Sequence, residues 1–96
     1  MNGETTLVEI SLEDIQQGKP KKARLCPAAL ATQKKIGTKE IYFCPYYALW
    51  LTPEGSLFSS LDSLVKEFIQ RFDDGKKVEP MVFALHWNDK LGKGDY

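Results

Sequence analysis

The two cysteines and the single histidine of this 96-residue chain are the side chains best suited to covalent chemistry. Cys26 immediately precedes Pro27, at which a helix is predicted to begin. A helix N-terminus and nearby cations, here Lys22 and Arg24, lower the pKa of a thiol and make it a better nucleophile. A nucleophile also needs a base, and no cysteine-enzyme signature links His86 to this thiol. We therefore interpret Cys26 as a small buried thiol, and we predict no catalytic residue and no enzymatic activity.

The same residues are also candidate metal ligands. Cys26, Cys44 and His86, together with an acid, contain the right atoms, but zinc sites usually draw ligands from local pairs, and neither a CxxC nor an HxxxH pair is present. Asp73 and Asp74 are adjacent, so their carboxylates point in different directions; we interpret them as part of a solvated turn. The sequence predicts no metal and no cofactor.

Basic residues are concentrated in one part of the chain. Residues 19–39 contain seven of the thirteen lysines and arginines and no acid. Such a stretch could follow a phosphate backbone while exposed tyrosines stack on bases, or the helix start at Pro27 could bind a single phosphate or nucleotide. The zero net charge and the lack of an RNA-binding signature or a phosphate loop argue against both. Nucleic-acid or nucleotide-phosphate binding is therefore the alternative hypothesis, with Lys19, Lys21, Lys22, Arg24, Lys34 and Lys35 as its candidate site residues.

Aromatic residues cluster in residues 42–50, where a strand is expected. Alternate side chains of a strand point to opposite faces, so these aromatics cannot all pack against helices, and a leftover aromatic face is often an interface. The leading hypothesis is a non-enzymatic module that docks a protein partner or a second copy of itself, a homodimer. Its candidate interface residues are Tyr42, Tyr46, Tyr47, Trp50 and Trp87.

Length and composition set the class of protein. Ninety-six residues make one small domain, 43% of the residues are hydrophobic, and the sequence pI is near 6.6. No stretch approaches the roughly 20 apolar residues of a membrane span, and the first ten residues carry acids where a signal peptide needs bases. We predict a cytoplasmic protein with no membrane partner and with free thiols rather than a disulfide.

The best-defined unit is a helix followed by a strand, over residues 59–87. Ser59 and Asp62 resemble a capping box, and Gly75 is expected to end the helix. Residues 78–87 are predicted to form a strand, with Val82, Ala84 and His86 on one face and Phe83, Leu85 and Trp87 on the other. The apolar face of the helix is predicted from helical spacing to consist of Leu61, Leu64, Val65, Phe68, Ile69 and Phe72.

The rest of the chain completes an α+β fold. A strand is predicted at residues 5–11, then a short helix from Ser11 to Gln17 whose SLED start resembles a capping box, and a helix from Pro27 that ends at Gly37. Residues 39–51 suit a strand in which Pro45 marks either an edge or bulge, or a turn between two strands. A turn at residues 52–55 and a short strand at 56–58 follow. The predicted fold is a small two-layer sandwich with helices on one face of a three- to five-stranded antiparallel sheet (β-α-α-β-β-α-β), one domain at 1–87 and a flexible tail at 88–96.

The chain contains the segments Gly18-x-Pro20, Cys26-Pro27-x-Ala29-x-Ala31 and Phe68-Ile69-x-x-Phe72-Asp73-x-Gly75-x-x-Val78-x-Pro80-x-x-Phe83. This pattern resembles small, uncharacterised proteins of phages and prophages, over about residues 5–85. The resemblance implies an accessory protein, and some small phage proteins act by binding and blocking host or defence components. It implies no functional residue, and the tail after Trp87 is mostly missing from the pattern.

Overall fold

The computed structural model describes residues 4–88, and within them the element order is β-α-α-β-β-β-α-β. The α+β class is confirmed, with one more strand than the order predicted from the sequence. Residues 89–96, most of the predicted tail, lie outside the described residues. The elements are β1 (Glu4–Ile10), α1 (Leu12–Gln17), α2 (Pro27–Ile36), β2 (Ile41–Phe43), β3 (Tyr47–Thr52), β4 (Gly55–Ser60), α3 (Ser63–Asp73) and β5 (Met81–Trp87).

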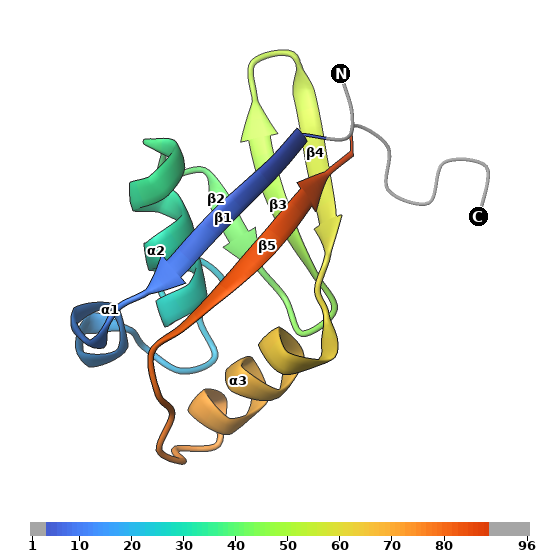
Figure 1. The fold of residues 1–96 in the computed structure, drawn as a ribbon. Helices are drawn as coiled ribbons and strands as arrows, with labels where there is room; N and C mark the ends of the chain where they lie inside the picture. The colour runs from blue at the N-terminus through green and yellow to red at the C-terminus, as the bar shows by residue number, and fades with distance from the viewer. Residues whose placement is uncertain (1–3, 89–96) are drawn as a thin grey trace.

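The strands form two antiparallel sheets that meet at one point. β1 pairs with β5, and β2, β3 and β4 form a meander (Figure 1). The backbone N–H and C=O groups of Phe58 in β4 and Asn88 after β5 bond each other, both at 2.7 Å, and the His86 N–H donates to Ser59 Oγ at 2.9 Å. The strands therefore follow one another in the order β1, β5, β4, β3, β2, an order that the sequence alone did not give.

Helix α2 packs against both β1 and β2, the strands at the two ends of this series. Small side chains make this close approach feasible: Ala28 and Ala29 are fully buried and Ala31 is 3% exposed. The predicted start and end of the helix are confirmed. Cys26 is the N-cap, its Sγ accepting from the Ala29 N–H at 3.4 Å, and Gly37 is the left-handed C-cap.

The short helix α1 is tied to α2 by a buried carboxylate. The predicted box at its start is present, because Ser11 and Asp14 each bond the backbone N–H of the other. Asp14 also receives the Lys34 ammonium at 2.7 Å. Burial alone would raise the pKa of Asp14, but the bonds from Lys34 and Ser11 outweigh it and lower that pKa. Asp14 thus stays ionised while linking the two helices.

Two predictions about α3 need correction. Ser59 is not its cap: it belongs to β4, is buried, and accepts from His86. The N-cap is Asp62, whose Oδ1 accepts from the Val65 N–H at 3.0 Å. Leu64, expected on the apolar face, is 65% exposed, whereas Val65, Phe68 and Ile69 are buried as predicted. Gly75 has φ 78°, a value that glycine adopts without strain, and the helix ends just before it.

The alternation predicted for β5 is confirmed. Phe83, Leu85 and Trp87 are buried, with Trp87 fully enclosed. The Phe83 ring meets Phe43 edge-on at 6.2 Å, so the β1–β5 and β2–β4 sheets share one core. The strand itself begins at Met81, later than predicted. Of the two alternatives for Pro45, the turn is observed: it lies between β2 and β3.

Gly18 marks the closest approach of α1 to α2. Its φ of −69° suits any residue, but a Cβ there would sit 2.7 Å from Pro27 Cδ. We predict that Gly18→Ala lowers the free energy of unfolding by about 1–3 kcal/mol through overpacking. Urea denaturation measures this, and the same substitution in a Pro27→Ala background should cost less because the clashing ring is gone. An equal cost in both backgrounds would contradict the steric explanation.

Candidate contact surface on the outer face of the sheet

The pairing of β2, β3 and β4 sorts their side chains into two faces. Opposed residues in a ladder share a face, and the pairs that include the buried Ile41, Phe43 and Ala48 define the inner one. The other face of the three strands carries large apolar and aromatic side chains. We call it the outer sheet face. Ser56 and Ser60 also lie on it, and its large side chains are Tyr42, Tyr47, Leu49, Leu51 and Phe58.

A row of three residues runs across the outer sheet face. Tyr42 opposes Leu49, and Leu49 opposes Phe58, so each strand contributes one apolar side chain. Tyr47 meets Phe58 edge-on at 5.8 Å. All four are partly exposed, and Leu51 beside them is 38% exposed. The face is therefore ordered by contacts among its own side chains while keeping apolar area in contact with water.

Two of the five predicted interface residues lie on the outer sheet face, a third is exposed next to it, and two pack against the core. Tyr42 and Tyr47 lie on the outer sheet face, and Tyr46, 71% exposed, directly precedes β3. Trp87 is fully buried, so its prediction as an interface residue is wrong. Trp50 opposes the buried Ile41 and meets Trp87 at 5.4 Å, so it packs against the core.

Leu49, Leu51 and Phe58 belong to the surface and were missed from the sequence. Leu49 and Leu51 follow Tyr47 at intervals of two in one strand, and the alternation alone would have placed them on its face. Phe58 could not be found in this way, because its side depends on the register of β4 against β3.

The structure divides the basic stretch into two parts. Lys34 and Lys35 are in the last turn of α2 and line a groove beside β1, where Lys34 is engaged by Asp14. Residues 19–25 form the other part, an ordered loop that we call the basic loop. Its exposed cationic residues are Lys19, Lys21, Lys22 and Arg24.

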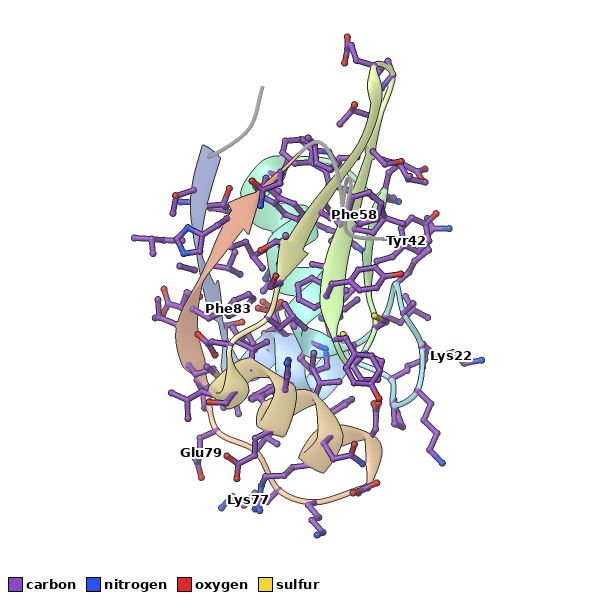
Figure 2. The ribbon with its side chains drawn as sticks, turned by 90° about the vertical axis from the view of Figure 1, so that its right-hand side faces the viewer. Lys22, Tyr42, Phe58, Lys77, Glu79 and Phe83 are labelled. Atoms are coloured by element: carbon purple, nitrogen blue, oxygen red, sulfur yellow. The ribbon has the colours of Figure 1, made fainter. Side chains whose placement is uncertain are left out.

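The basic loop borders the outer sheet face. The Phe43 N–H donates to the Ala23 carbonyl at 2.8 Å, which fixes the loop against β2. The Arg24 guanidinium then lies over the Tyr42 ring, 5.4 Å from its centre, in a cation–π contact. Figure 2 shows Lys22 and Tyr42 at the same border of the molecule, away from Phe83 in the core. Two groups of candidate residues that are separate in the sequence thus meet at one edge.

The basic loop is held rigidly although its side chains are exposed. The Lys19 N–H donates to the Leu25 carbonyl at 2.8 Å, and the Cys26 N–H donates to the Lys22 carbonyl at 3.1 Å. Asp73 Oδ1 accepts from the Lys21 N–H at 2.8 Å, so this acid has a structural partner. Within residues 4–88, no ion pair involves any of the four cations of the loop.

Cys26 does not have the environment of a nucleophile. It is 3% exposed, and burial raises the pKa of its thiol to about 11, against the lowering by the backbone N–H groups of Ala29 and Ala28. His86 is exposed and its Nδ1 lies 3.1 Å from Thr5 Oγ1. The interpretation of Cys26 as a buried thiol is confirmed. Across residues 4–88, no three residues among His, Cys, Asp and Glu are grouped so that they could hold a metal ion.

Other exposed apolar side chains lie elsewhere on the molecule, among them Leu12 and Leu25. Leu7 and Val82, both more than half exposed, lie on the outward side of β1 and β5. Leu64 of α3 borders a groove of about 440 Å³ with Val78 and Met81. Within the described part of the chain, none of the helices is both long and apolar enough to cross a membrane.

The chain was compared with known proteins. No protein-family model, no characterised protein sequence and no solved structure matches it.

Buried Cys26 should alkylate slowly in the folded protein. With a pKa of about 11, its thiolate fraction near neutral pH is about a hundredfold below that of an ordinary thiol. We expect iodoacetamide to modify the partly exposed Cys44 first and both residues equally in urea, as followed by peptide mass mapping. Modification of Cys26 at the same rate with and without urea would contradict its buried, protonated state.

Proposed function

We propose that this chain is a non-enzymatic binding module that docks a protein partner through the outer sheet face. One observation carries the proposal: the three strands whose inner side builds the core have an apolar outer side, on which no helix of residues 4–88 packs (Figure 2). The row of Tyr42, Leu49 and Phe58 would gain roughly 25 cal/mol for each Å² of apolar surface that a partner removes from water.

The chemistry of this face suits protein contacts. Tyrosine and phenylalanine are enriched at interface centres because their rings bury a large area at a small loss of side-chain entropy. Here the rings are already held by the Tyr47–Phe58 contact and by Arg24 over Tyr42. Such preorganisation lowers the cost of binding.

Binding of single-stranded nucleic acid is the second candidate, and one observation favours it. Arg24 joins the basic loop to Tyr42, so cations for phosphates adjoin rings for bases. The positions of Lys34 and Lys35 argue against nucleic-acid binding, because these two lysines border β1. The candidate cations in the basic loop are then Lys19, Lys21, Lys22 and Arg24. We rank it second because the chain carries no net positive charge.

The biological role of the binding module is also part of the proposal. The resemblance to phage and prophage proteins suggests an accessory protein that blocks a host or defence component, and docking without catalysis is how such a protein would act. A phage origin and a cytoplasmic location both stay predictions.

We predict that Leu49→Asp lowers partner capture at least about tenfold, because it brings a carboxylate into an apolar contact. The tagged chain is used to capture proteins from lysate, with and without nuclease, and bound proteins are identified by mass. The matched control is Leu64→Asp, the same change at an exposed site in α3.

The proposal is supported by a stoichiometric protein that survives nuclease, is lost with Leu49→Asp and is retained with Leu64→Asp. Equal capture by both variants would overturn it. Bound material that disappears with nuclease and with added salt would support the nucleic-acid candidate instead.

A further inference from the structure

We infer that the partner that the outer sheet face is built to accept is a second copy of this chain, and that two copies associate face to face around a two-fold axis. The inference rests on the proposed docking function of this face. It is carried by the charges at the two ends of the face, which are opposite in sign.

One end of the face is positive. The basic loop is fixed at Phe43 by the bond to Ala23, and Phe43 opposes Ala48 near the start of β3. Lys22 and Arg24 therefore lie along the outer edge of β2, level with the beginning of β3, and Figure 2 shows Lys22 projecting outward at this edge. Neither cation has an ion-pair partner within residues 4–88.

The other end has a net negative charge. Glu40, whose carbonyl accepts from the Leu51 N–H, and Glu54 lie there with one cation, Lys39. The turn that joins β3 to β4 contains Glu54 at its tip, next to the paired Thr52 and Gly55. Figure 1 shows this hairpin projecting beyond the neighbouring strands. Glu54 is exposed, and none of the ion pairs found within the described residues involves it.

A two-fold axis brings the unlike ends together. In a symmetric dimer, residue i of one copy meets residue j of the other, and j meets i. Thr52, the last residue of β3, lies four residues from Ala48, or about 13 Å at the usual rise per residue, and Glu54 lies beyond it in the turn. An axis lying between the two sheets, halfway along this span, passes near Leu49 and Leu51. Rotation about this axis brings the apolar centres of the two faces together. It also brings Glu54 of each copy next to the basic loop of the other copy.

Charge makes this arrangement selective. The chain has no net charge, so two copies do not repel each other overall. Superposing the faces without exchanging their ends would set Lys22 against Lys22, whereas the two-fold arrangement forms two opposite-charge contacts. The face spans only three strands, a size typical of a weak interface. The dimer should therefore be concentration-dependent.

The test is the oligomeric state of the purified chain, measured by sedimentation over a roughly hundredfold range of concentration. Lys22→Glu and Glu54→Lys should each weaken the dimer about tenfold, since each sets like charges together at both contacts. An equimolar mixture of the two variants should dimerise again, because each contact then joins opposite charges. The double variant should also dimerise. Both positions are exposed, and circular dichroism verifies that each variant folds.

Leu49→Asp should abolish the dimer, and Leu64→Asp should leave it intact. Wild-type protein that stays monomeric throughout overturns the inference. So does a dimer that Leu49→Asp leaves unchanged, or a mixture of the charge variants that fails to associate. A monomer that still captures another protein, and loses it with Leu49→Asp, overturns self-association alone and leaves the proposed docking function standing.

Discussion

The structure depends on the packing of α2 between β1 and β2. The contacts of β5 with β1 and of Phe58 with Asn88 arrange the five strands of residues 4–88 around one core, and β1 and β2 are left at the ends of the series. An alanine-rich face is what lets a helix come close to both strands at once. The Asp14–Lys34 ion pair and the contact of Gly18 with Pro27 then fix α2 at both ends. Larger side chains on this face would push the strands apart.

This arrangement also explains why the outer sheet face stands open. Helix α2 fills the space between β1 and β2, and Trp50 and Trp87 fill the interior. The opposite side of β2–β4 therefore has no helix on it within residues 4–88 (Figure 1). The loop that leads into α2 is bonded to β2 through Ala23. The cations of this loop therefore lie at the edge of the outer sheet face, beside β2 and next to the start of α2.

Local signals in the sequence predicted what local contacts determine. The box at Ser11, the N-terminal proline of α2 and the alternation of β5 each depend on residues within one turn or one strand. Ser59 failed as a cap because a distant backbone group, the His86 N–H, takes its hydroxyl. The candidate surface was predicted only in part for a similar reason. Tyr42 and Tyr47 were found, but the turn at Pro45 and the register of β4 decide that Trp50 points inward and Phe58 outward, and both depend on how neighbouring strands pair rather than on the residues within one strand.

The proposed contact surface of this chain is the outer sheet face. It can be tested by comparing backbone amide chemical shifts in dilute and concentrated samples of the isotope-labelled chain. Self-association through this face should give shifts that grow with concentration in β2, β3, β4, the basic loop and the turn at Glu54, while β1 and α3 stay unchanged. Shifts centred instead on Leu7 and Val82, or on Leu64, would contradict it and would identify a different contact surface.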